Sequence, residues 1–284
     1  MVVALLIAGA ALAHATWNIA LKRAGTSGPG FMWATLVVGA VVFAPFGIAS
    51  LVAEGTDLAR WAPLAVVSGV LQVVYFLILQ RGYRLGDVSI VYPLARGTGP
   101  LLAVVLAIVV LGERPGWTVL LGAAIVIAGV VVIGLAGGRA RFGDNRAGIR
   151  YGLIVGVMIA VYTVWDGAAV TAGGMPPVGL YWGSLVFQLL LLAIPVLRRA
   201  RGTAAVARQH WVAVLLVGVL SPLGYVLVLE AIQLAPISVV APAREVSVVL
   251  VGLAGWMLFR EPNPVQRLIG AGVVLVGVAL LSLP

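Results

Sequence analysis

The chain contains no cysteine and little charge. Of its 284 residues, two are His and 10% are charged, whereas 62% are hydrophobic. The absence of Cys excludes disulfides and thiolate metal sites. The sequence therefore does not indicate whether the protein lies in an oxidising or a reducing compartment. Soluble domains have about 25% charged residues. This composition therefore excludes a soluble protein and predicts a single membrane domain over residues 1–284.

The few charges are mostly basic and give a net charge of +9. They lie in short loops between apolar segments, where basic residues orient a membrane protein and meet anionic headgroups. We interpret the excess of basic residues as the signal that orients the protein in the membrane, rather than as a nucleic-acid-binding surface. The expected partners are the lipid bilayer and a small solute, with no nucleic acid.

Long apolar runs divide the chain into membrane-spanning segments. A span needs about 20 apolar residues, and this length predicts ten helices. They are Val2–Leu21, Phe31–Val52, Ala62–Gly82, Val88–Leu111, Trp117–Ala136, Ile149–Val170, Val178–Leu197, Trp211–Gln233, Ile237–Phe259 and Leu268–Leu283.

The two halves of the chain repeat each other at one gapless offset of 148 residues. A single register that pairs Trp, Arg and Glu is hard to obtain by chance. It predicts two five-helix repeats, residues 1–138 and 149–284. The superimposed pairs are Trp17 with Trp165, Arg96 with Arg244, Glu113 with Glu261, Gly122 with Gly270, and Gly129 with Gly277.

Loop charges predict that the second repeat is inverted. Loops after odd-numbered helices contain Lys22, Arg23, Arg81, Arg84, Arg139, Arg141, Arg146, Arg150, Arg198, Arg199, Arg201, Arg208, Arg260 and Arg267. The other loops contain only Arg60 and Arg114. By the positive-inside rule the first group is cytoplasmic, so we expect a multi-pass plasma (inner) membrane protein with both termini extracytoplasmic.

An inverted repeat of this kind is common in secondary transporters, whose substrate site lies near the bilayer midplane between the repeats. The expected fold is therefore all-α, with ten transmembrane helices in two inverted repeats around a central cavity. Because one chain contains both halves, a monomer is sufficient to form the cavity. The sequence does not exclude a homodimer.

Arg96 lies within the fourth apolar segment, between Pro93 and Pro100. An Arg at a helix centre costs about 2.5–3.5 kcal/mol on insertion scales, so it normally faces a cavity and has a partner. The two prolines predict an interrupted helix around Arg96. Tyr92 lies one turn earlier on the same face.

The counterpart of Arg96 is Arg244, which is followed by Glu245. We predict that the two arginines, one from each repeat, point into a shared cavity. The alternative is that each neutralises an internal carboxylate, Asp166 or Glu245, and locks helices together. Both roles are compatible.

Further polar residues lie four apart in the first and sixth segments: His14 with Asn18, and Tyr162 with Asp166. Trp17 and Trp165 flank these faces, as pocket walls or as interfacial anchors. The third segment adds Gln72 and Tyr75, and the eighth adds Tyr225. Asp166 and Glu245 are the candidates for proton coupling, because an unpaired carboxylate in lipid is costly.

Two further patterns predict structural roles. The stretches "GAAIVIAGVVVIG" and "GAGVVLVG" place small residues at helical spacing, which favours close helix packing and leaves a dimer surface as a lesser option. Glu113 and Glu261 each follow an apolar helix, and we expect them to cap helices or tie loops rather than to bind solute.

The stretch "VYPLARGTGPLLAVVLAIVVLGERPGWTVLLGAAIVIAGVVVIG" and its repeat "VVAPAREVSVVLVGLAGWMLFREPNPVQRLIGAGVVLVGVALL" resemble the drug/metabolite transporter superfamily, in its EamA-type branch. The resemblance covers nearly the full length. It implies two inverted five-helix repeats, a central cavity, and alternating access for a small metabolite, often as an exporter. The opening "HATWNIALKR" is similar to a subset of this branch loosely associated with phosphonate metabolism.

Two arginines suit a carboxylate or phosphate, and Asp166 with Glu245 would suit an ammonium group. The leading hypothesis is therefore a secondary active or facilitative transporter of a small anionic or zwitterionic metabolite such as an amino acid, organic acid or phosphonate. A cationic drug would need more aromatic lining and net negative charge. This substrate, and a lipid-linked one carried by a flippase on the same fold, are the alternatives.

A membrane-embedded enzyme is a more remote hypothesis. It would need clustered His, Asp or Glu, and the sequence contains no HExxH-type motif. It also lacks a nucleotide-binding loop of the Walker type, which argues against direct use of ATP. We expect no cofactor, no metal and no catalytic residue.

Overall fold

The structure, a computed structural model, is an all-helical bundle and describes residues 1–25, 28–55, 57–136, 146–198, 200–260 and 263–282. Its helices are α1 (Val2–Ala24), α2 (Pro29–Ala53), α3 (Leu58–Leu85), α4 (Val88–Leu111), α5 (Trp117–Leu135), α6 (Arg146–Val170), α7 (Pro177–Leu197), α8 (Ala200–Gln209), α9 (Trp211–Leu234), α10 (Ile237–Ala243), α11 (Val246–Phe259) and α12 (Pro264–Leu281). In this described part, ten spans are long and apolar enough to cross a membrane, with α10 and α11 together forming one of them. The predicted ten-helix fold is confirmed.

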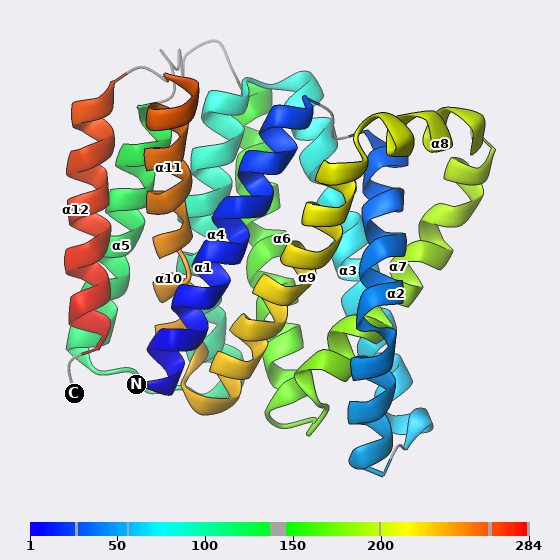
Figure 1. Cartoon of the computed structure of the whole chain (residues 1–284). Coiled ribbons are helices and arrows are strands. Elements are labelled where there is room, and N and C mark those ends of the chain that lie inside the picture. Colours follow the sequence, from blue (N-terminus) through cyan, green and yellow to red (C-terminus); the bar gives the residue numbers. More distant parts are fainter. Residues whose placement is uncertain (26–27, 56, 137–145, 199, 261–262, 283–284) are drawn as a thin grey trace.

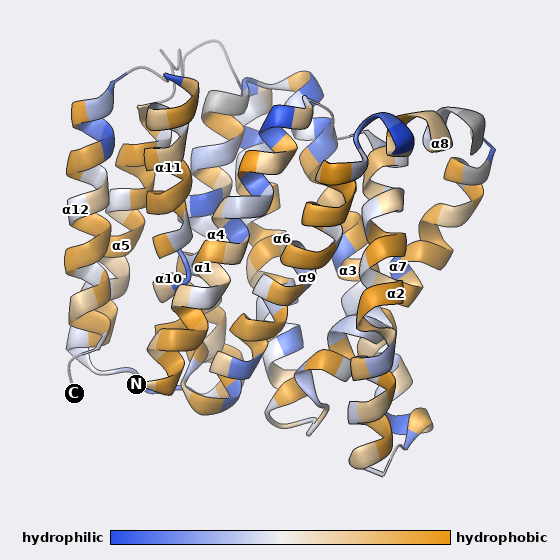
Figure 2. Cartoon of the chain, in the orientation of Figure 1, coloured by the Kyte–Doolittle hydropathy of each residue, from blue (hydrophilic) through white to orange (hydrophobic). Residues whose placement is uncertain are grey.

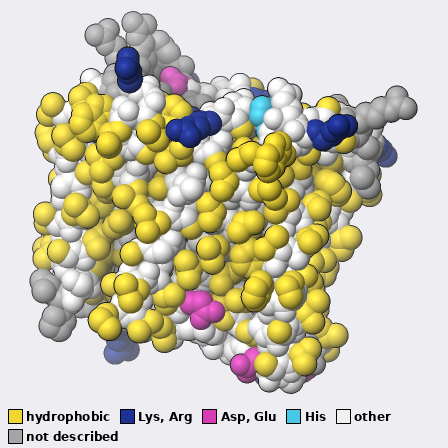
Figure 3. Space-filling model, viewed as in Figure 1, with side chains coloured by type: hydrophobic (Ala, Val, Ile, Leu, Met, Phe, Trp, Pro, Cys, Tyr) yellow, Lys and Arg dark blue, Asp and Glu magenta, His cyan; other side chains and the backbone are white. Residues whose placement is uncertain are grey.

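The spans run up and down, so both termini lie at one end of the bundle and α8 lies at the other (Figure 1). Most residues along the spans are hydrophobic (Figure 2). On the face drawn in Figure 3 they form a broad band, and Lys and Arg side chains gather mainly at the edge where α8 lies. This band is the surface that lipid would cover.

Several helix ends differ from the predicted ones. α3 begins at Leu58, four residues early, because the Asp57 side chain accepts hydrogen bonds from the backbone N–H groups of Ala59 and Arg60 and so caps the helix. α8, which we had predicted as a loop, is a short amphipathic helix whose Val206 packs against the cluster around Phe31. Of the predicted loop charges, Arg139, Arg141 and Arg199 lie outside the described residues, as does the Arg201 side chain.

Helices α5 and α12, which are equivalent in the two repeats, pack along a glycine seam. A Cβ added to Gly122 would lie 2.9 Å from the carbonyl oxygen of Gly277, and one added to Gly277 would lie 2.8 Å from that of Gly122. Gly129 and Gly270 face each other in the same reciprocal way, at 2.8 and 3.0 Å. Because Gly122 is the repeat mate of Gly270 and Gly129 that of Gly277, this cross-pairing is the pattern of a two-fold axis. The predicted inverted repeat and close helix packing are confirmed.

The helix interruption that we predicted around Arg96 is wrong. α4 runs unbroken through Pro93 and Pro100, since each proline removes a single backbone donor and the helix continues around it. The break lies instead in the other repeat, between α10 and α11. There Glu245, Ser247 and Val248 donate backbone hydrogen bonds three residues back, at 3.0, 3.1 and 2.8 Å, in place of the α-helical pattern.

Glu113 joins the two repeats at the end of the bundle where the termini lie. Its carboxylate accepts hydrogen bonds from the backbone N–H groups of Ile237 and Ser238, at 2.7 and 3.0 Å, in the first turn of α10. The predicted capping role of Glu113 is thus confirmed. Its repeat mate Glu261 lies outside the described residues.

Replacing Gly270 with Ala should lower the thermal midpoint of the detergent-solubilised protein. The new Cβ would lie 2.7 Å from Ile133 Cγ1 and 3.0 Å from the Gly129 carbonyl oxygen. Overpacking of this kind costs about 1–3 kcal/mol. Gly272→Ala is the matched control, because nothing lies within 4 Å of its added Cβ. Equal midpoints for the two variants would contradict the close seam.

Candidate functional site

A cavity of about 540 Å³ occupies the centre of the bundle. Its inner part is lined by residues such as Ala10, Tyr181 and Val228, and its outer part by Gly25 and Tyr83. Gly25 follows α1 and Tyr83 lies in the last turns of α3, so the cavity extends from the centre to the end opposite the termini. Nine predicted site residues line it: His14, Trp17, Asn18, Gln72, Tyr75, Tyr92, Arg96, Tyr162 and Arg244.

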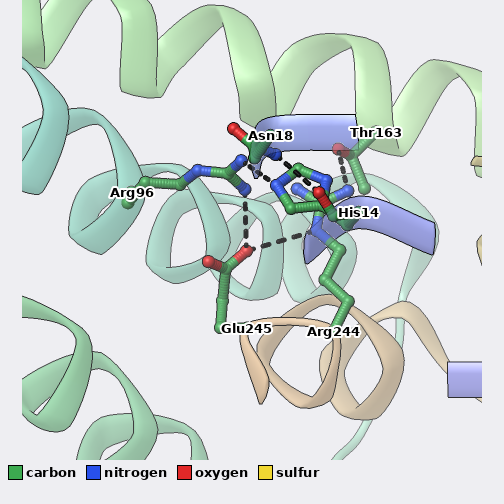
Figure 4. A network of polar contacts seen from close by, with 6 residues as sticks. All are labelled: His14, Asn18, Arg96, Thr163, Arg244 and Glu245. Atoms are coloured by element: carbon green, nitrogen blue, oxygen red, sulfur yellow. Dashed lines mark hydrogen bonds and ion pairs between the residues drawn. The ribbon is translucent and has the colours of Figure 1, made fainter. Parts of the chain in front are cut away.

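The two repeat-related arginines meet at one carboxylate (Figure 4). An oxygen of Glu245 lies 3.6 Å from Nη1 of Arg96 and 3.4 Å from Nε of Arg244. Consecutive residues of an α-helix do not face each other. The contact between Arg244 and Glu245 therefore depends on the break between α10 and α11.

Glu245 lies behind the arginines rather than beside the cavity. The Arg96 and Arg244 side chains keep 18% and 10% of their surface exposed, whereas Glu245 keeps 1%. Neither of its carboxylate oxygens accepts a hydrogen bond within the described part of the chain. Its attachment to the cluster is therefore electrostatic, and the guanidinium groups present positive charge to the cavity.

Other side chains hold the arginines in place. Nη2 of Arg96 lies 2.7 Å from Nε2 of His14, and the Arg244 Nη1 donates to the Thr163 hydroxyl at 3.5 Å. A guanidinium can only donate, so the His14 Nε2 is the acceptor and the imidazole is neutral. The Arg96 Cζ also lies 5.7 Å from the centre of the Tyr92 ring, within the range of a cation–π contact.

Asn18 belongs to the same wall but does not contact the arginines through its amide nitrogen. Its Nδ2 donates to the His14 carbonyl oxygen at 2.8 Å, one turn back along α1. The remaining face of its side chain lines the cavity.

A second polar cluster surrounds Asp166, which is fully buried behind Gln72 and Tyr225. Its Oδ2 accepts from the Tyr225 hydroxyl at 2.7 Å and from the Gln72 amide at 3.5 Å. Its Oδ1 has no hydrogen-bond partner among the described residues. Asp166 and Glu245 thus lie one layer behind the cavity surface.

Sequence reasoning missed the contribution of α7 to this cluster. Gln188 donates to Ser184 at 3.0 Å and to the Gln72 side-chain oxygen at 3.4 Å, and it lines the cavity. A single Gln inside the apolar run "LVFQLLLLAI" was the signal available for it. The nearby Tyr181, in the second turn of α7, also lines the cavity and was not among the predicted site residues.

Tyrosine rings form the wall between the two clusters. Ring centres lie 5.5 Å apart for Tyr75 and Tyr162, 5.9 Å for Tyr162 and Tyr225, and 4.9 Å for Tyr225 and Tyr181. These spacings are typical of edge-to-face aromatic contacts. The wall offers ring faces and hydroxyl groups to an apolar or unsaturated solute group.

The repeat-related tryptophans have different positions. Trp17 lines the cavity and meets the His14 ring edge-on at 4.9 Å. Trp165 does not line it, and its indole N–H donates to the Leu64 carbonyl oxygen of α3 at 3.1 Å. Trp17 therefore lies where a pocket-wall residue would, whereas Trp165 contacts α3 instead of the cavity.

A smaller cavity of about 250 Å³ adjoins the first and shares Asn18, Lys22 and Tyr92 with it. Apolar residues of α11, including Val248 and Phe259, form much of its wall. No group of three or more His, Cys, Asp or Glu is placed to hold a metal ion in the part of the chain that the structure describes. The residues that line the two cavities offer charge, hydrogen bonds and aromatic rings.

Comparison with known proteins supports this architecture. The model of the EamA-like transporter family matches residues 1–135 and 146–283. A solved crystal structure with 21% sequence identity superimposes with a TM-score of 0.74, over 99% of this chain and 96% of the other. At that identity the likeness concerns the fold alone.

Two curated relatives match shorter stretches. A probable terminal-alkyne amino-acid exporter of Streptantibioticus cattleyicolor is 32% identical over an alignment of 84 residues, which covers 24% of this chain and 28% of the exporter. A probable 4-amino-4-deoxy-L-arabinose-phosphoundecaprenol flippase subunit, ArnE of Klebsiella pneumoniae, is 34% identical over 59 residues, 21% of this chain and 53% of the subunit. The chain therefore matches only part of the length of either relative.

Replacing Trp165 with Phe should lower stability and leave solute binding unchanged. The substitution removes the hydrogen bond to Leu64, which is worth about 1 kcal/mol, at a position away from the cavity. Thermal midpoints measured with and without a stabilising solute separate the two effects. Trp17→Phe is the matched comparison, and a lost solute response in Trp165→Phe would show that this indole acts on the site.

Proposed function

The chain belongs to the EamA-like transporter family, and from that premise we propose that it moves a small anionic or zwitterionic metabolite by alternating access. It is a multi-pass membrane transporter and not an enzyme. The observation that carries the substrate class is the pair Arg96 and Arg244, which faces the cavity from both repeats while the carboxylate between them lies behind.

An acidic group is the solute feature that fits this pair. Two guanidinium groups and one carboxylate leave one positive charge uncompensated beside a cavity in the membrane. Arginine binds planar carboxylates and phosphates through parallel hydrogen bonds. A carboxylate, phosphate or phosphonate entering the cavity would complete the charge balance.

The remainder of the cavity suits the other parts of an amino-acid-like solute. An ammonium group would meet the side-chain oxygen of Gln72 and the tyrosine rings, with Asp166 one layer behind. The tyrosine wall would receive an apolar side chain. The amino-acid exporter among the relatives agrees with this substrate class, and we propose export as the direction.

We further propose that the cavity opens toward the cytoplasm. It reaches the end of the bundle where the last turns of α1 and α3 carry Lys22, Arg23 and Arg84, and basic residues that flank membrane spans are retained on the cytoplasmic side. Both termini would then be extracytoplasmic. The opposite end is closed by packed residues such as Leu180, Leu229 and Ile237.

A lipid-linked substrate is the second candidate, favoured by the smaller cavity. Its apolar wall adjoins the charged centre through Asn18 and Tyr92, so a head group and a chain would have separate compartments. A cationic drug fits less well. The aromatic lining that such a solute needs is present, but the charges facing the cavity are positive.

Replacing Arg96 with Ala should abolish solute binding and transport while leaving insertion and yield largely intact. Removing one member of a buried charge pair costs several kcal/mol, so a loss of roughly a hundredfold in affinity is expected. A thermal-shift screen of the purified protein against amino acids, organic acids, phosphonates and cationic drugs measures it. A ligand of the site stabilises wild type by mass action and leaves Arg96→Ala unaffected.

Arg60→Ala is the control, because Arg60 is an exposed arginine at the start of α3. Arg96→Lys keeps the positive charge but loses the planar guanidinium that donates two parallel hydrogen bonds. It should therefore bind the solute more weakly than wild type. The proposal is contradicted if cations or lipids stabilise wild type and Arg96→Ala equally while acidic compounds stabilise neither protein. The arginine pair would then only hold helices together, and the second candidate, a lipid-linked substrate, would be favoured.

Replacing Asp166 with Asn should remove the pH dependence of transport, since we propose this buried carboxylate as the group that carries a coupling proton. Uptake into proteoliposomes across a series of external pH values measures the effect, with Gln188→Leu as a neutral change in the same cluster. A profile that keeps its wild-type shape in Asp166→Asn would assign Asp166 to structure or to solute contact.

A further inference from the structure

Glu245 is the one charged member of the arginine cluster that does not line the cavity. Solute and Glu245 therefore do not compete for the same position. The carboxylate touches the arginines from behind, through Nη1 of Arg96 and Nε of Arg244. Both guanidinium groups keep part of their surface on the cavity side.

The repeats are asymmetric at this position. The residue equivalent to Glu245 in the first repeat is Gly97, so the second repeat alone supplies a carboxylate. His14 is neutral, as its contact with Arg96 requires. The centre of the empty cavity therefore holds two positive charges and one negative charge. The other charged groups nearby are Asp166 behind Tyr225, Lys22, which lines the mouth of the cavity, and Arg267, which lines the smaller cavity.

Alternating access requires the cavity to close, and closing expels the water that solvates the arginines. An uncompensated buried charge is strongly unfavourable, whereas a paired one is tolerated. Without Glu245, an empty cavity would close around two positive charges. With Glu245 it closes around one, and with a bound acidic group around none.

We infer that Glu245 is the residue that lets the empty transporter reorient, so that the protein carries out net transport instead of obligatory exchange. The inference rests on the proposed alternating access and on the acid-binding role of the arginine pair. A transporter without Glu245 has the same local charge when loaded as the wild type has when empty. Glu245→Gln should therefore reorient with a solute bound and stall without one.

The absence of native cysteine offers a direct assay of empty reorientation. Ala10 lines the deep end of the cavity, one turn from His14, and is 4% exposed. In an Ala10→Cys protein this thiol is the only one. A membrane-impermeant methanethiosulfonate, added to vesicles from the face opposite the cavity mouth, reacts only when that face opens. The buffer contains no solute and only a bulky sulfonate as its anion.

The parent Ala10→Cys protein should be modified from that face without solute. Adding Glu245→Gln should slow this modification by about tenfold, because closure around two positive charges is disfavoured. Modification from the mouth side should continue, which shows that the variant is folded. Adding Arg244→Gln to Glu245→Gln restores the wild-type charge and should recover most of the rate.

Glu230→Gln is the matched control, a partly buried carboxylate of α9 outside the cavity lining, and its rate should equal the parent's. The inference is overturned if the parent is never modified from the far face without solute, or if Glu245→Gln reacts as fast as the parent. It is also overturned if the double variant stays as slow as Glu245→Gln, since Glu245 would then act through packing.

None of these outcomes depends on solute binding. The thermal-shift screen with Arg96→Ala therefore tests the proposed function separately. Once a solute is identified, Glu245→Gln should retain exchange between loaded vesicles and external solute, and should lose efflux into solute-free buffer by about tenfold. Equal loss of both fluxes would contradict the assignment.

Discussion

The structure depends on a single carboxylate shared by two guanidinium groups in the middle of a hydrophobic bundle. Membrane interiors tolerate charge only where it is paired or reaches an aqueous space, and Arg96 and Arg244 have both. The turn that separates α10 and α11 allows the consecutive residues Arg244 and Glu245 to converge. The position of the cavity in front of the arginines follows from the same arrangement.

The bundle combines a symmetric frame with an asymmetric centre. The glycine seam between α5 and α12 obeys the two-fold relation in its reciprocal contacts. The polar groups around the cavity do not: Asp166 corresponds to Asn18, Tyr162 to His14, and Glu245 to Gly97. Symmetric packing suits alternating access, because the two access states then have similar energy. Recognition of a solute whose two ends differ requires cavity walls that also differ.

The fold could be predicted from the sequence because each signal for it is spread over many residues. Ten apolar runs, one repeat offset and the two arginines were readable without coordinates, since lipid imposes length and composition on every span. The break beside Arg244 was not readable. A proline precedes each arginine, at Pro93 and Pro242, and whether a helix bends or breaks at a proline depends on the surrounding contacts, which here include the ion pair between Glu245 and Arg96. Likewise, the depth at which Asp166 and Gln188 lie is set by how the helices rotate against each other, which hydropathy does not encode.

The equivalence of Gly97 and Glu245 also bears on how such a chain can arise by gene duplication. Two copies of the first half could pair through their α5 helices by the same glycine spacing. Their centre, however, would contain two arginines and no carboxylate behind them. The second half is therefore not interchangeable with the first, because its one acidic residue at this position gives the chain a centre that a dimer of its first half would lack.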